Sequence, residues 1–192
     1  MDMSASFEGR HVVVTGGTGA LGSAVVALLV ERGPICHVPS HGPDAPAHFT
    51  LRDHPNVKIV SNIDLTNEAS VDTFYGAIPS LWASIHTAGG FAASPIAETG
   101  KNALLVQIET NFVTSALCCR AAVAGMRRSG SGRIVNVVSR QALEWRGPRM
   151  GRAGRTGRLR LPLIFGRHRL TPIHGSAGSL RTSRPTVKAS SG

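Results

Sequence analysis

The hydrophobic positions of the first three quarters of the chain follow two alternating patterns. Short β-branched runs such as His11–Thr15 are typical of strands buried on both faces of a parallel sheet. Longer stretches rich in Ala, Leu and Val are typical of helices. The pattern predicts strands at residues 11–15, 35–38, 57–61, 81–87 and 133–139, and helices at residues 20–32, 68–77 and 102–128, the second with Thr66 or Asn67 as its N-cap.

This alternation predicts a single α/β domain. Successive strand–helix–strand units connect through right-handed crossovers, which gives a parallel sheet covered by helices on both faces. We therefore expect a Rossmann-like doubly wound sheet over residues 1–145, truncated after the fifth strand. A chain of 192 residues is too short for two ordinary domains.

The last quarter of the chain has a different composition. Residues 1–144 carry 10 Lys and Arg against 11 Asp and Glu, whereas residues 145–192 carry 11 Lys and Arg and no acid. The net charge of +10 therefore comes from this end alone. Because its apolar residues follow no period, we expect residues 146–192 to form a disordered basic tail. Our hypothesis is that this tail is non-native and follows a shift of the reading frame.

Several classes of protein are not expected from this composition. No apolar run reaches the roughly 18 residues that a membrane helix requires, and the N-terminus lacks the apolar core of a signal peptide, which predicts a cytoplasmic protein. Three cysteines do not form a disulfide framework, and we expect Cys118 and Cys119 to be small apolar residues of a buried helix. His37 and His41 are interpreted as solvated loop residues, so no metal site is expected.

A glycine-rich turn carries the first candidate chemistry. Thr15–Gly22 follows a predicted strand and begins a predicted helix, which is the context of a dinucleotide-binding loop. Gly17, Gly19 and Gly22 fit G-x-G-x-x-G, in which the glycines allow a tight turn and a close approach to a pyrophosphate. The N–H groups of the following helix would face the phosphates. Asp44 lies late for a ribose contact and residues 38–44 contain no arginine, so the choice between NAD and NADP stays open.

Further motifs extend this pattern along the chain. They are Asp64-Leu65 after the third strand, His86-Thr87-Ala88-Gly89 after the fourth, Asn111 in the long helix, and Gly132-Arg-Ile-Val-Asn-Val-Val-Ser139. With the glycine turn, they resemble the short-chain dehydrogenase/reductase family over about Gly9 to Ala142. The resemblance implies that Asn111 and Ser139 are catalytic, and that the cofactor-binding residues are Gly16, Gly17, Gly19, Leu21, Gly22, Asp64, Leu65, Ala88 and Gly89.

The resemblance implies hydride transfer between NAD or NADP and a small carbonyl or alcohol substrate, in a family that is usually homo-oligomeric. In that family a Tyr is the general acid or base, a Lys lowers the pKa of the Tyr, and a Ser polarises the substrate oxygen. The Lys is required because an ordinary Tyr pKa near 10 is too high for proton transfer at neutral pH.

The sequence departs from the family at two places. The family's Asn-Asn-Ala-Gly is replaced by His86-Thr87-Ala88-Gly89, which is expected to weaken the role of Thr87 in stabilising the sheet. The Tyr-x-x-x-Lys pair is also absent: Tyr75 lies upstream on a predicted helix, and Lys188 is the only lysine after Ser139. We therefore predict little or no reductase activity for this chain.

Three other functions share part of this pattern. A non-catalytic NAD(P)-binding protein is compatible with the surviving half of the cofactor site. Non-specific nucleic-acid binding by the basic tail is not favoured, because the tail has almost no aromatic residues and no periodic helix. The nucleotide-sugar branch of the same superfamily shares the glycine turn, but it requires a larger C-terminal substrate domain. No membrane partner is expected.

Overall fold

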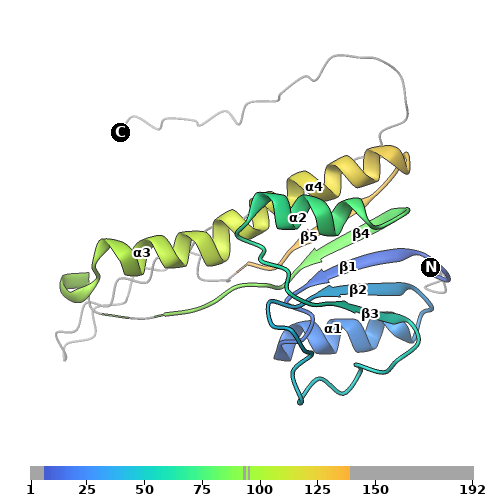
Figure 1. The fold of residues 1–192 in the computed structure, drawn as a ribbon, viewed down its shortest axis with the longest axis horizontal. Coiled ribbons are helices and arrows are strands. Elements are labelled where there is room, and N and C mark those ends of the chain that lie inside the picture. Colours follow the sequence, from blue (N-terminus) through green and yellow to red (C-terminus); the bar gives the residue numbers. More distant parts are fainter. Residues whose placement is uncertain (1–6, 93, 95, 139–192) are drawn as a thin grey trace, which may run out of the picture.

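The computed structural model describes residues 7–92, 94 and 96–138. Within them the chain forms a five-stranded parallel sheet of order β3-β2-β1-β4-β5 (Figure 1). This confirms the predicted Rossmann-like α/β fold, since the strand order reverses between β1 and β4. The strands are β1 (His11–Thr15), β2 (Ile35–Pro39), β3 (Val57–Val60), β4 (Leu81–His86) and β5 (Arg133–Asn136).

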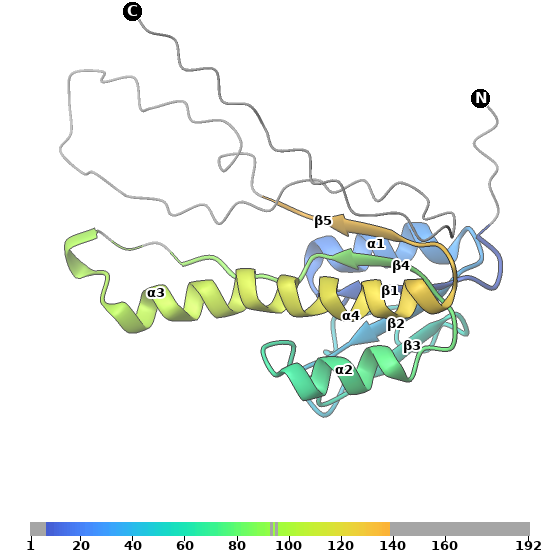
Figure 2. The same ribbon diagram turned by 90° about the horizontal axis from the view of Figure 1, so that it is seen from above.

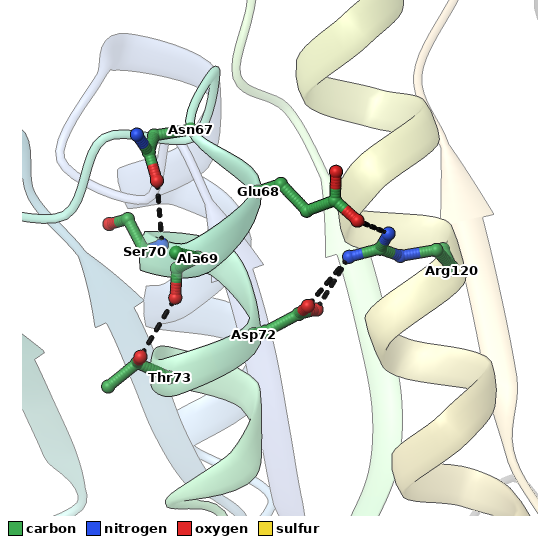
Figure 3. A network of polar contacts seen from close by, with 7 residues as sticks. All are labelled: Asn67, Glu68, Ala69, Ser70, Asp72, Thr73 and Arg120. Carbon is green, nitrogen blue, oxygen red and sulfur yellow. Dashed lines mark hydrogen bonds and ion pairs between the residues drawn. The ribbon is translucent and has the colours of Figure 1, made fainter.

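Helices cover both faces of the sheet. α1 (Ala20–Val30) packs on one face, and α2 (Glu68–Gly76) lies beside α4 (Thr114–Arg128) on the other (Figures 1 and 2). Asn67 is the N-cap of α2, because its side chain accepts a 3.0 Å hydrogen bond from the Ser70 N–H. Between α2 and α4, Arg120 pairs with Glu68 and, at 2.7 Å, with Asp72 (Figure 3).

The long helix predicted at residues 102–128 is not one regular α-helix. It consists of α3 (Lys101–Ile108), a π-helical turn η2 (Glu109–Val113) and α4, preceded by the short 3₁₀ helix η1 (Ile96–Glu98). α3 extends past the end of the sheet in both ribbon views and buries none of its residues. None of the helices in the described ranges has the length and apolar character of a membrane span.

The core is divided by the sheet into two apolar layers. Val12, Val13 and Val14 of β1 are all fully buried, because alternate side chains point to opposite faces and both faces are covered. Val12 and Val14 pack towards α1, whereas Val13 packs with residues of α2 and α4. Each buried Val side chain contributes roughly 1.5–3 kcal/mol of hydrophobic free energy.

Two cysteines of α4 differ in their surroundings. Cys118 is buried, as predicted, and burial raises the pKa of its thiol to about 12. Cys119 is only half-buried, so the prediction that both are core residues is wrong for Cys119. The two side chains differ because adjacent residues of a helix point about 100° apart.

The connection from β2 to β3, residues 40–56, contains no helix. Phe49 of this connection is fully buried in the apolar layer on the α1 side of the sheet, with Val38 and Val57. This single aromatic residue anchors the loop where a crossover helix would otherwise cover the sheet.

β5 lies at the edge of the described sheet. Val135 of β5 and Val137 just after it are 48% and 49% exposed, so this edge of the described sheet presents apolar side chains. The strand ends at Asn136 rather than at the predicted residue 139. Ser139, the basic tail and its predicted disorder lie outside the described residues.

Candidate functional site

The candidate site lies where the strand order reverses, at the carboxyl ends of β1 and β4. In an open α/β sheet, ligands bind in the crevice at this position. Gly16 has a φ of +68°, and a Cβ on it would lie 2.6 Å from the Ala88 nitrogen. The turn after β1 therefore approaches the segment after β4 more closely than any other residue type would allow.

Thr87 joins these two segments. Its backbone N–H and its hydroxyl both donate to the Thr15 carbonyl, at 3.1 and 2.7 Å, and the Ala88 N–H reaches the Thr15 hydroxyl at 3.4 Å. The replacement of the family's Asn-Asn was expected to weaken the sheet-stabilising role of Thr87, yet the hydroxyl of this short side chain still reaches the β1 carbonyl directly.

The glycine turn forms a cradle of backbone groups. A Cβ on Gly22 would overlap the Gly16 carbonyl group, and a Cβ on Gly17 would lie 2.9 Å from a methyl group of Val38. Gly19 is the N-cap of α1 and provides no side chain to cap it, and the first turn of α1 has no acidic residue. The uncapped N–H groups and the helix dipole suit an anion such as a pyrophosphate. Leu21 is 54% exposed beside this turn.

Asn111 lies in the π-helical turn and holds the segment after β4. Its Oδ1 accepts from the Gly90 N–H, and its Nδ2 donates to the carbonyls of Gly90 and Gln107, each at 3.0 Å. A Cβ on Gly89 would lie 2.8 Å from Asn111 Oδ1. Both N–H groups of Asn111 are thus committed to backbone, and π turns are frequent at functional sites.

Asp64 and Leu65 follow β3, at the same end of the sheet. Asp64 Oδ1 accepts from the hydroxyl and the N–H of Thr66 at 2.7 and 2.8 Å, and these bonds hold the pKa of its carboxyl group below the usual value. The Ile63 N–H donates to the Ser40 carbonyl, which brings this segment beside the end of β2. Leu65 is partly buried against the α2 layer.

A buried polar chain adjoins the site and was not predicted. His86 is 4% exposed; its Nδ1 donates to Asn136 Oδ1 at 2.7 Å, and its Nε2 accepts from the Ser84 hydroxyl at 2.8 Å. The Tyr75 hydroxyl lies 2.8 Å from the Ser84 hydroxyl. Tyr75 is 2% exposed, so it is a core residue. Burial lowers the pKa of His86 to about 4 and raises that of Tyr75. The sequence signal that could have indicated this chain is the pair of polar residues at alternate positions 84 and 86 of a strand that is otherwise apolar and buried.

His37 does not lie in a loop, so that prediction is wrong for this residue. It belongs to β2, and its Nε2 lies 2.8 Å from His11 Nδ1 on β1. Partial burial, and then the proximity of His11 and Lys58, lower the pKa of His37 to about 4. His41 follows the strand and is exposed. Across residues 7–92, 94 and 96–138, no three His, Cys, Asp or Glu side chains gather as a metal site would require.

One contact of the glycine turn was also missed. His48, in the loop after β2, donates from Nε2 to the Thr18 carbonyl at 3.0 Å. Its sequence neighbourhood has no periodicity or motif that would have indicated this contact. Of the predicted site residues, those that the structure brings together at the carboxyl ends of β1 and β4 are Gly16, Gly17, Gly19, Gly22, Ala88, Gly89 and Asn111.

Comparison with known proteins gives one family. The sequence profile of the short chain dehydrogenases matches residues 10–148. The chain is 33% identical over 144 residues to a cis-4-hydroxycyclohexanecarboxylate dehydrogenase of Sinomonas cyclohexanicum, a match that covers 71% of this chain and 57% of that protein.

Solved structures show the same fold. A short-chain type dehydrogenase/reductase from Mycobacterium ulcerans superposes with a TM-score of 0.65 at 26% identity, over 71% of this chain and 54% of that one. A variant of ElxO with NADPH bound gives a TM-score of 0.64 at 21% identity, over 71% and 58%. The chain thus spans little more than half the length of these relatives.

Proposed function

Because the chain belongs to the short-chain dehydrogenase family, we propose that it binds NAD or NADP at the carboxyl ends of β1 and β4. The observation that carries this proposal is the cradle formed by Gly16, Gly22 and Ala88, in which backbone groups approach so closely that no side chain fits. An anion between these groups and the uncapped start of α1 would meet N–H donors and the positive end of the helix dipole.

Each part of the cofactor has residues suited to it. The glycine turn, with Gly17, Gly19 and Leu21, would hold the pyrophosphate. Asp64 and Leu65, which follow the carboxyl end of β3, would border the adenine. Ala88 and Gly89 would form the wall beside the nicotinamide ribose, and Asn111 fixes that wall through Gly90. When bound, the cofactor supplies or accepts a hydride.

The substrate class is a small molecule with a carbonyl or alcohol group. Asn111 and Ser139 are the proposed remainder of the catalytic set, with Ser139 outside the described residues. Because the sequence has no Tyr-x-x-x-Lys after Ser139, we propose a chain that binds cofactor with little or no turnover. The absence of a general acid or base costs roughly 10²–10⁴-fold in rate. A non-catalytic NAD(P)-binding role is therefore the second candidate.

We further propose a cytoplasmic protein that forms homo-oligomers and has no membrane partner. Its three cysteines are free thiols, as a reducing compartment favours. Nucleic-acid binding by the basic residues 146–192 remains the less favoured prediction, because this segment has almost no aromatic residues and no helical period in its sequence.

The test is titration of the full chain with NADH and with NADPH, with nicotinamide fluorescence as the readout of binding. We expect saturable binding of the reduced cofactors. With NAD⁺ or NADP⁺ as the hydride acceptor, we expect no oxidation of cis-4-hydroxycyclohexanecarboxylate, the alcohol named for the Sinomonas relative, beyond the rate without protein. Turnover at a rate typical of enzymes would contradict the proposed loss of catalysis.

Variants of the turn separate the cofactor site from general folding. Gly22→Ala should abolish binding, because its Cβ would overlap Gly16. Gly19→Ala, whose Cβ would lie 3.3 Å from the Gly16 carbonyl, should weaken binding while the fold is kept. Gly76→Ala is the matched control, since nothing lies within 4 Å of its Cβ. Unchanged binding in folded Gly19→Ala and Gly22→Ala would refute the site.

A further inference from the structure

The loop after β2 contacts the glycine turn through one side chain. Phe49 is fully buried under the sheet and fixes the loop, and the preceding residue, His48, donates to the Thr18 carbonyl. Thr18 is the central residue of the turn between Gly17 and Gly19. An imidazole 30 residues away in sequence is therefore held at the rim of the candidate cofactor site.

The position of His48 matches the adenosine end of a bound dinucleotide. A Cβ on Gly17 would touch Val38, so the turn and the end of β2 adjoin. In doubly wound folds the ribose 2′ position lies beside this strand end, where an acid binds the 2′-hydroxyl of NAD and a cation accommodates the 2′-phosphate of NADP. His48, in the loop after β2, contacts the glycine turn that borders this position.

No carboxylate occupies the end of β2 itself. The first residue after the strand is Ser40, which is buried and joined to β3 through the Val60 carbonyl. The nearest acid along the loop, Asp44, is exposed, and Asp64 is committed to Thr66. A carboxylate suited to the 2′-hydroxyl of NAD is therefore missing from the end of β2.

The remaining charges of the region nearly balance. The loop carries Asp44, Asp53 and Arg52, the last of which donates to the Pro46 carbonyl, together with His41 and His54. Residues 16–24, on the other side of His48, contain no ionisable side chain. His48 is thus the ionisable group in contact with the turn, with its Nε2 on Thr18 and its Nδ1 on the opposite side of the ring.

From this placement we propose that the chain prefers NADP(H) to NAD(H), and that His48 is the residue that recognises the 2′-phosphate. The inference rests on the proposed cofactor site. A phosphate monoester beside an imidazole favours its protonated form, and the charged ring then donates a hydrogen bond to a phosphate oxygen.

The experiment compares two fragments of the cofactors, adenosine 2′,5′-bisphosphate and adenosine 5′-monophosphate, by calorimetric titration of the full chain. We expect the bisphosphate to bind about tenfold more tightly, the ratio given by one charge-assisted hydrogen bond of about 1.4 kcal/mol. His48→Gln keeps a neutral donor for Thr18 and should reduce this ratio to below about threefold. His54→Gln in the same loop is the control and should keep the tenfold ratio.

The outcomes separate this inference from the cofactor site. If neither nucleotide nor NADH binds, the site and the inference both fail. If both nucleotides bind equally to the unaltered chain, or if His48→Gln keeps the tenfold ratio, the site stands and the inference fails. A ratio that is lost in Arg52→Gln and kept in His48→Gln would also overturn it, because Arg52 would then hold the phosphate.

Discussion

The buried imidazole of His86 makes the stability of the domain sensitive to acid. Burial lowers its pKa from 6.5 to about 4, since a charge on a ring that is 4% exposed loses its hydration. The unfolded chain, with an imidazole pKa near 6.5, takes up this proton first as the pH falls. Stability due to His86 is therefore fully present above pH 6.5 and is lost as the pH falls towards 4.

The size of the effect follows from the two pKa values. At pH 5.5 the unfolded state gains about 1.4 kcal/mol relative to the folded state, and at pH 4 about 3 kcal/mol. These losses are a large part of the 5–15 kcal/mol that usually stabilises a domain. Urea unfolding of the full chain between pH 7.5 and 4, monitored by circular dichroism, measures them directly.

The variant His86→Asn isolates this contribution. It lacks the titrating ring and should be less stable than the unaltered chain at pH 7.5, because the hydrogen bonds to Ser84 and Asn136 are disturbed. Its stability should then fall by about 1.4 kcal/mol less between pH 7.5 and 5.5. His37→Asn removes a half-buried imidazole with the same direction of shift and should reduce the pH dependence by a smaller amount. Identical pH dependence in the unaltered chain and in His86→Asn would refute this reasoning.

Two further predictions concern stability. Phe49→Ala should lower the free energy of unfolding by about 3–5 kcal/mol, because it empties a fully buried aromatic site. Urea unfolding at pH 7.5 measures this change, and a loss below about 1 kcal/mol would mean that Phe49 does not anchor the loop. Arg120→Met removes the pairs with Glu68 and Asp72 drawn in Figure 3, yet it should change stability by less than about 1 kcal/mol, since all three side chains are about half exposed or more; a loss above 2 kcal/mol in the same assay would contradict this.

Local patterns in the sequence determined the fold class and the outline of the site. β-Branched runs such as His11–Thr15 predict strands buried on both faces, because such side chains pack well only on a pleated surface that is covered on each side. The sequence indicated Thr66 or Asn67 as the N-cap of α2 by their short polar side chains, and the structure decided for Asn67. The glycine turn was recognisable because its residues contact one another within eight positions, from Thr15 to Gly22.

Tertiary structure decided the features that join distant segments. The π turn interrupts the long helix where Asn111 binds Gly90, a partner 21 residues away, and no helical periodicity encodes that partner. The same holds for His86 with Asn136, 50 residues apart, and for His48 with Thr18, 30 residues apart. These pairs meet because the sheet order β3-β2-β1-β4-β5 sets neighbouring parallel strands side by side, so that their carboxyl ends and the segments that follow them lie together. Hydrophobic patterning specifies which residues are buried, whereas the order of the strands specifies which of them become neighbours.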